Sequence, residues 1–154
     1  WPLYSKADRE HAWEDYFNQM LAMVKNPLVT ILAHPWDSVE HAAGGWFKSR
    51  AVKDIDYGAI AELPQEYNDK LMNALLEYDK AAEINLGVLN SLRLPEVCRK
   101  KYWNMLAQWR EAGVKFTFGT DQHAAHYDPA VIAASELLLD FYGFKDEDVK
   151  YLFD

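Results

Sequence analysis

Four side chains able to bind a divalent metal ion lie within or just after three short apolar segments of the chain. They are His34, Glu83, Asp121 and His123. Imidazole nitrogen and carboxylate oxygen are donors that suit Zn, Mn and Fe in proteins. The Asp-x-His spacing of the last two lets both leave one loop towards a shared centre. A metal ion held there would acidify a water into a nucleophile and neutralise charge on a phosphoryl or carbonyl oxygen.

Each residue alone also has an ordinary structural explanation. A histidine after a strand is commonly a core or capping residue, as His34 could be. An Asp-x-His in a loop is commonly an Asx turn with an exposed imidazole. Glu83 could simply bond to backbone or to Asn85, because a carboxylate in an apolar strand needs a polar partner. Their joint occurrence at three strand ends favours a metal site.

The elements that must position these groups are three predicted strands, at residues 28–33, 81–86 and 114–119. The first two are short apolar runs, and the third alternates apolar and polar residues. Helices are predicted between them, and strands separated by helices imply right-handed crossovers and a parallel sheet. The carboxyl ends of parallel strands share one edge, so we expect the four side chains to meet there.

Helical spacing of apolar residues, with proline and glycine at the ends, predicts five helices. They run from Ser5 to Asn26, from Pro64 to Tyr78, from Pro95 to Gly113, from Asp128 to Tyr142 and from Asp146 to Phe153. Residues 38–61 give no clear pattern. Three strands are too few for a complete α/β sheet or barrel, so residues 1–154 are predicted to be a single unit, the carboxyl-terminal half of a larger domain.

Composition narrows the class of protein. The formal net charge is -8, with 24 acidic against 16 basic residues, so neither nucleic acid nor an anionic membrane is an expected partner of the whole surface. No apolar run approaches the roughly 18 residues of a membrane span. The single cysteine, Cys98, rules out an intrachain disulfide and fits a reducing, cytoplasmic location.

Three segments of the chain resemble, in order and spacing, the last three motifs of the PHP (polymerase and histidinol phosphatase) family. They are Ile31-Leu32-Ala33-His34-Pro35, Ala82-Glu83-Ile84-Asn85 and Phe118-Gly119-Thr120-Asp121-Gln122-His123. The similarity extends over residues 10–142, and its specificity comes from three ordered motifs rather than from any one. The last motif departs mildly from the family, which usually has Gly-Ser-Asp-Ala-His.

The resemblance implies a distorted, TIM-like β/α barrel of the PHP type, here lacking its amino-terminal strands. It also implies a centre with more than one metal ion and hydrolysis of phosphoesters. By motif matching, His34, Asp121 and His123 are metal ligands. Glu83 matches the family's strand acid, in a position behind a ligand or facing the substrate. Asp121 and Glu83 are therefore the predicted catalytic carboxylates.

Two further residues could contact a small phosphorylated substrate. Arg93, in the loop after the Glu83 strand, is placed to clamp a phosphate through two hydrogen bonds. His126, beside the Asp121 loop, could reach the substrate. For both, the alternative is an ordinary surface residue.

We therefore predict a metal-dependent phosphoesterase whose other half is missing here. The family's amino-terminal His-x-His pair has no counterpart in this sequence, so this part alone is expected to be inactive. One alternative is a related amidohydrolase, in which a strand-end aspartate is the base and water attacks a carbonyl. The other is a metal-binding or regulatory module without catalytic activity.

Overall fold

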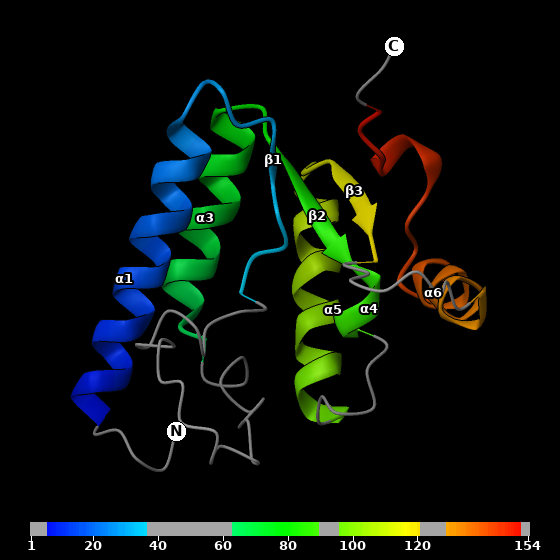
Figure 1. Ribbon diagram of the computed structural model, residues 1–154, viewed down its shortest axis with the longest axis horizontal. Helices are drawn as coiled ribbons and strands as arrows, with labels where there is room; N and C mark the ends of the chain where they lie inside the picture. The colour runs from blue at the N-terminus through cyan, green and yellow to red at the C-terminus, as the bar shows by residue number, and fades with distance from the viewer. Residues whose placement is uncertain (1–5, 37–62, 90–95, 121–128, 152–154) are drawn as a thin grey trace.

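The computed structural model describes residues 6–36, 63–89, 96–120 and 129–151 (Figure 1). Its elements, in order, are α1 (Lys6–Lys25), β1 (Ile31–Leu32), α3 (Gln65–Glu77), β2 (Ala81–Asn85), α4 (Leu86–Leu89), α5 (Glu96–Glu111), β3 (Phe116–Gly119), α6 (Pro129–Phe141) and a 3₁₀ helix (Asp146–Asp148). Helices separate the strands, as in a mixed α/β fold. The predicted fold class is confirmed at this level.

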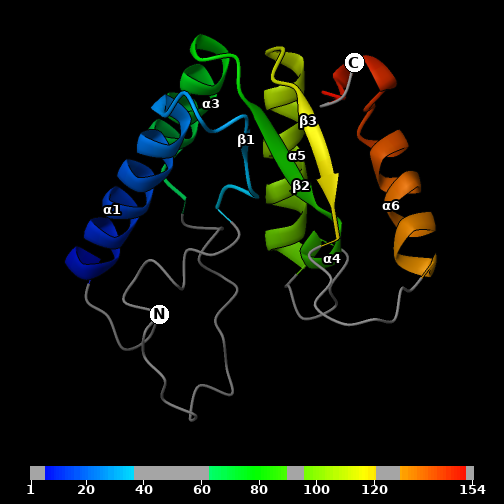
Figure 2. The same cartoon turned by 45° about the horizontal axis from the view of Figure 1, so that its top comes forward.

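The three strands form one parallel sheet in the order β1-β2-β3. Ile31 pairs with Ala81, and Glu83 pairs with Thr117. Consecutive strands are thus neighbours, and right-handed crossovers then place α3 and α5 on the same face. In two views α5 lies behind β2 and β3, and no described helix crosses in front of them (Figures 1 and 2). The predicted parallel sheet is confirmed.

The helix-covered face of the sheet forms the core. Its strand residues are Leu32, Ala82, Ile84 and Phe116, none more than 1% exposed. They join one cluster with buried helix residues that include Leu71, Leu75, Leu106 and Trp109. Complete burial of such side chains contributes about 1.5–3 kcal/mol each. The face that carries Glu83 lacks this cover among the described elements.

The helices that lead into the sheet end in the same way. In α5, Gly113 has a φ of 100° and its N–H donates to the Arg110 carbonyl, while the Val114 N–H donates to the Trp109 carbonyl. This is a Schellman motif, which terminates a helix at a left-handed residue. Asp79 takes the same place after α3, with a φ of 48°. The predicted stop at Gly113 is confirmed.

Two predicted elements differ from the structure. The first strand is limited to Ile31–Leu32, because residues from Asn26 onwards form a turn in which the Asn26 side chain accepts the Leu28 N–H. The predicted helix from Asp146 to Phe153 is reduced to the 3₁₀ helix Asp146–Asp148, and the prediction is wrong for residues 149–151. After the 3₁₀ helix, Val149 pairs in parallel with Phe116, and the Lys150 N–H donates to the Phe116 carbonyl. Pairing with the open edge of β3 satisfies this backbone and overrides the local helical pattern.

Candidate functional site

The first two sequence motifs meet at the carboxyl ends of β1 and β2. His34 Nδ1 lies 2.5 Å from Glu83 Oε2, although the two residues are 49 positions apart. Their side chains are 34% and 21% exposed, so the pair is partly buried but open to solvent. Glu83 alternates with the buried Ala82 and Ile84, which places its side chain on the uncovered face of the sheet.

The third motif reaches the same place through Gly119, the last residue of β3. A Cβ atom built on Gly119 would overlap the Glu83 carboxylate, so the carboxylate lies directly against this backbone. Gly87 makes a second close approach, because a Cβ there would collide with the Thr120 carbonyl oxygen. Glycines at strand ends commonly permit such contacts. Glu83 thus lies between His34 and the segment that leads into Asp121.

The backbone at His34 adopts an uncommon conformation. Its φ is 61°, and Trp36 two residues later has a φ of 70°. A non-glycine residue in the left-handed region costs about 1–3 kcal/mol and persists only where its surroundings fix it. Such residues cluster at functional sites, so this geometry is a second reason to expect chemistry here.

Three aromatic residues and a hydrogen bond fix the segment around His34. Trp36 is 1% exposed, and its ring makes edge contacts with Trp13 and Tyr16 at centroid distances of 5.7 and 5.8 Å. The Tyr102 hydroxyl of α5 donates to the Pro35 carbonyl at 2.6 Å. The His-Pro turn is therefore attached to the core directly after His34, through the Pro35 carbonyl and the Trp36 ring.

The contact with Glu83 gives His34 a defined chemical role. An ionised carboxylate only accepts hydrogen bonds, so it favours the tautomer with the proton on Nδ1. Nε2 is then the ring nitrogen that Glu83 does not engage. A carboxylate behind a histidine orients the ring and raises its basicity, an arrangement shared by metal-ligating histidines. The pair could equally serve to accept a proton from a substrate or a water.

The other predicted site residues cannot be placed beside this pair. Asp121 and His123, the remaining predicted ligands, lie outside the described residues, as do Arg93 and His126, the predicted substrate contacts. Within the ranges that the structure does describe, no three His, Cys, Asp or Glu side chains form a group able to hold a metal ion. The predicted site therefore remains a prediction for these four residues.

Sequence reasoning missed two residues that shape the site. Local spacing places Tyr102 only on an apolar helix face, whereas its hydroxyl bonds to the Pro35 carbonyl. The signal that could have found it was a tyrosine on the buried face of a helix, because a buried phenol hydroxyl needs a hydrogen-bond partner. Gly119 was noticed only as part of the third motif. The signal for its role was that glycine has no side chain, which leaves room for the Glu83 carboxylate.

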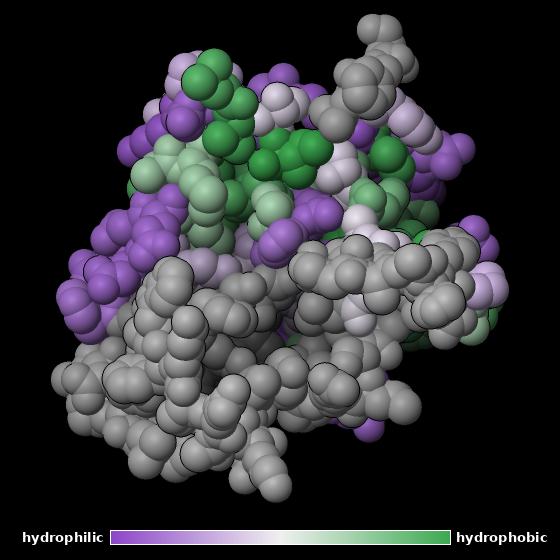
Figure 3. Space-filling model, viewed as in Figure 1, coloured by the Kyte–Doolittle hydropathy of each residue, from purple (hydrophilic) through white to green (hydrophobic). Residues whose placement is uncertain are grey.

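Figure 3 shows the side of the molecule on which no described helix crosses β2 and β3. Apolar residues gather near the start of β1 and β2, and hydrophilic residues follow over the lower part of β2. None of the described helices combines the length and the apolar character needed to cross a membrane.

Comparison of the chain with protein-family models, with curated proteins and with solved structures returns no match. The likeness to the PHP family therefore rests on the three sequence motifs alone. The geometry at His34 and Glu83 has to be interpreted on its own chemistry.

Proposed function

We propose that this chain is the carboxyl-terminal part of a metal-dependent phosphoesterase of the PHP type, built on a partial TIM-like barrel. The observation that supports it most is the meeting of His34, Glu83 and Gly119, which belong to three separate motifs. Sheet order adds support, because consecutive parallel neighbours with helices on one face are the repeating unit of β/α barrels. Doubly wound sheets instead carry helices on both faces.

The metal ligands in this proposal are His34, Asp121 and His123. Two imidazoles and a carboxylate form a donor set that suits Zn, Mn or Fe. When bound, such an ion is a Lewis acid that lowers the pKa of a water and neutralises charge on a phosphoryl oxygen. Glu83 does not bind the ion itself in this arrangement. Its carboxylate holds the proton of His34 Nδ1 and so fixes the direction of Nε2.

The substrate in this proposal is a small phosphorylated molecule. The Arg93 guanidinium would bind two phosphoryl oxygens at once and stabilise the charge that develops on them. His126 would contact the same substrate. Asp121 combines ligation with proton transfer, because a carboxylate at a strand end can accept a proton from the attacking water.

Metal content tests the ligand assignment. The purified 154-residue chain is incubated with Zn²⁺, Mn²⁺ or Fe²⁺, freed of excess ion, and analysed by inductively coupled plasma. We expect His34→Ala and Asp121→Ala to lose most of the metal that the unmodified chain retains. His11→Ala is the matched control, because His11 also pairs with a carboxylate, Asp15, but on an exposed helix surface. Equal metal content in all variants would show that His34 and Asp121 do not bind the ion.

Substrate screening tests the reaction class. We expect the chain alone to release no phosphate from p-nitrophenyl phosphate, since it lacks the His-x-His ligands that complete the centre. A longer form of the protein that carries this pair should release phosphate. Cleavage of amides or carboxylic esters without phosphate release would instead support the amidohydrolase alternative. Metal binding without either reaction would support the regulatory module.

A further inference from the structure

The helix α6 exposes large apolar side chains on its outer side. Leu137 is 72% exposed and Phe141 is 79% exposed. In two views the helix lies beyond β3, at the edge of the described fold opposite to α1 (Figures 1 and 2). Its inner side packs against the core through Ile132, Leu138 and Leu139. The helix is thus apolar on both its inner and its outer side.

Such a helix is unusual at a protein surface. The outer face of a surface helix normally carries polar residues, and a helix that is apolar all round is normally buried. The only polar residues among the 13 of α6 are Ser135, Glu136 and Asp140, and none is basic. At about 20 Å in length, α6 is too short to span a bilayer, and it lacks the Lys and Arg residues of helices that lie on membranes. A protein surface is therefore the expected cover.

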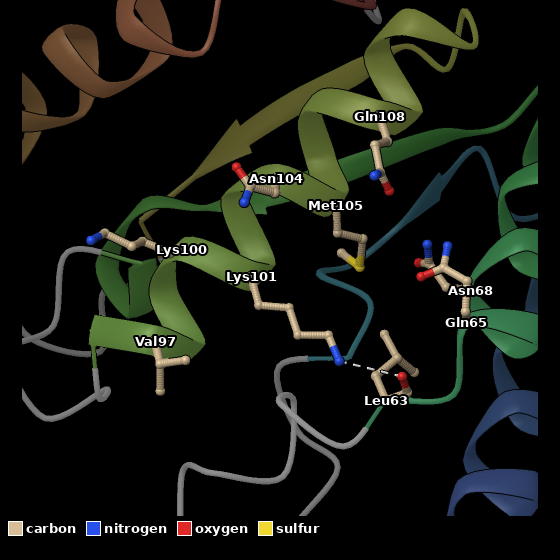
Figure 4. Close-up of a pocket in the computed structure, with 9 residues that line it drawn as sticks. All are labelled: Leu63, Gln65, Asn68, Val97, Lys100, Lys101, Asn104, Met105 and Gln108. Atoms are coloured by element: carbon tan, nitrogen blue, oxygen red, sulfur yellow. Dashed lines mark hydrogen bonds between the residues drawn. The ribbon is translucent and has the colours of Figure 1, made fainter.

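The hollow between α3 and α5 makes no comparable demand for a partner. Lys101 Nζ donates to the Leu63 carbonyl at 3.4 Å, and Lys100 Nζ pairs with Glu96 at 2.6 Å. Figure 4 shows both lysines beside this hollow, with the bond to Leu63 as a dashed line. Contacts within the chain already engage both charges there, whereas the outer face of α6 is left open to solvent.

The exposed apolar stripe of α6 has the same spacing in both directions. Its members follow one another at intervals of four, three and four positions, as Ala130, Ala134, Leu137 and Phe141. Intervals of three and four are those of a helix–helix contact. The small side chains lie in the amino-terminal half and the large ones in the carboxyl-terminal half. Two antiparallel copies of the stripe therefore place each leucine or phenylalanine against an alanine.

The charges of α6 favour the same arrangement. Glu136 and Asp140 both lie in its carboxyl-terminal half, where the helix dipole is negative and a carboxylate is unfavourable. In an antiparallel pair, Asp140 of one copy lies beside the first turn of the other α6, which is the positive end of that dipole. A parallel pair would instead bring the two Asp140 side chains together and would set alanine against alanine, with unfilled space between them.

We propose that the outer face of α6 binds a second copy of this chain, as an antiparallel helix pair in which Leu137 of each copy packs against Ala134 of the other. Two-fold symmetry makes each contact occur twice. A single helix of 13 residues presents less area than the roughly 800 Å² per partner of a standard interface, so the dimer is weak and depends on concentration. The His34–Glu83 pair takes no part in it, so this contact is independent of the proposed hydrolase activity.

Analytical ultracentrifugation of the 154-residue chain tests the dimer. We expect the average mass to rise from one chain towards two between about 10 μM and 1 mM. Leu137→Ala leaves a gap opposite Ala134, and Ala134→Leu sets two leucines against each other, so each variant alone should dimerise about 10-fold more weakly. An equimolar mixture of the two variants should dimerise as tightly as the unmodified chain, because every leucine then faces an alanine again.

Both substituted positions are exposed, so neither change should unfold the chain, and far-ultraviolet circular dichroism checks this. Leu28→Ala is the matched control, because Leu28 is an exposed leucine outside α6, and it should leave the dimer unchanged. A chain that stays monomeric up to about 1 mM, or a tighter dimer of Ala134→Leu, would overturn the proposal.

Two further results would overturn the dimer and identify another occupant of this face. Binding of a monomeric chain to phosphatidylcholine vesicles, lost in Leu137→Ala, would assign the face to a membrane surface. A longer form of the protein that stays monomeric where the 154-residue chain dimerises would show that the added residues cover α6.

Discussion

At the edge where the strands begin, three lysine side chains donate hydrogen bonds to backbone carbonyls, whereas at the edge where the strands end, His34 and Glu83 form a partly buried pair. Lys80 Nζ donates to the Val29 carbonyl at 2.6 Å, Lys115 Nζ to the Glu147 carbonyl at 2.5 Å, and Lys150 Nζ to the Asp79 carbonyl at 2.9 Å. Each lysine lies next to a strand or bridge residue and bonds to a carbonyl more than 30 positions away in sequence. At this amino edge, the lysines therefore bond to backbone carbonyls that have no partner within a helix or a strand pair.

The carboxyl edge does the opposite. It holds His34 in a left-handed conformation and keeps the Glu83 carboxylate partly buried, both of which cost free energy. That cost is offset by the core behind it, through Trp36 and Tyr102. The two edges therefore have different roles. The amino edge stabilises the fold, and the carboxyl edge uses core packing to position His34 and Glu83. Substitutions at each edge test whether these two roles are separate.

The largest effect is expected for Trp36→Ala, at the base of the carboxyl edge. Trp36 is 1% exposed and contacts both Trp13 and Tyr16. Deleting a buried tryptophan typically lowers the free energy of unfolding by about 3–5 kcal/mol. Urea unfolding of the full chain measures it. Trp36→Phe, which retains an aromatic ring, should lose clearly less. A loss below about 1 kcal/mol would mean that this anchor does not hold the edge.

Glu83→Gln should separate positioning from stability. The glutamine carbonyl can still accept a hydrogen bond from the His34 Nδ1–H group, but it carries no charge to raise the basicity of the ring. Loss of such a carboxylate typically lowers metal affinity or activity by about 10–100-fold. The free energy of unfolding should change by less than about 1 kcal/mol. Competition titration against a metal-binding dye gives the metal affinity. An unchanged affinity would show that the His34–Glu83 contact has only a structural role.

Gly119→Ala disturbs the same Glu83 carboxylate from the neighbouring strand β3. The added methyl group would push the Glu83 carboxylate away from its place without touching the His34 side chain directly. We therefore expect this variant to weaken metal binding in the same direction as Glu83→Gln. The two changes together should weaken it less than the sum of their separate effects, because both act through one contact.

Lys80→Met tests the amino edge. The Lys80 ammonium donates to the carbonyls of Val29 and Asn26, at 2.6 and 3.3 Å. Hydrogen bonds to a charged group contribute about 1.5–3 kcal/mol when buried, and a partly exposed one contributes less. We expect a loss of about 1 kcal/mol in unfolding free energy with metal affinity intact. Lys25→Met, at an exposed position, is the control. A fall in metal affinity would contradict the separation of the two edges.

The sequence predicted this architecture where local pattern and tertiary structure agree. Alternation within 81–86 correctly placed Glu83 on the face opposite Ala82 and Ile84, and Gly113 correctly marked the end of a helix. Parallel strands also made a meeting of His34 with Glu83 foreseeable. The pattern failed at Val149, where pairing with the β3 edge replaced the expected helix.

The fine structure of the site depended on contacts that no local pattern encodes. The hydrogen bond from Tyr102 to Pro35 joins residues 67 positions apart. No residue pattern around His34 predicts its left-handed backbone conformation. Both features lie within two residues of Trp36, which is 1% exposed. The positions of Asp121 and His123 lie outside the described residues, so the resemblance to the PHP family is their main support.

The smallest effect concerns the strain at His34 itself. His34→Gly and His34→Ala both remove the imidazole and its contact with Glu83, and they differ only by a Cβ atom. With a φ of 61° at this position, glycine avoids the left-handed penalty that alanine incurs, so His34→Gly should be more stable by about 1 kcal/mol. At the neighbouring Ala33, where no positive φ occurs, Ala33→Gly should instead lower stability by about 0.5–1 kcal/mol. The same sign at both positions in urea unfolding would show that the carboxyl edge stores no backbone strain. Opposite signs would locate that strain at the residue proposed to bind the metal.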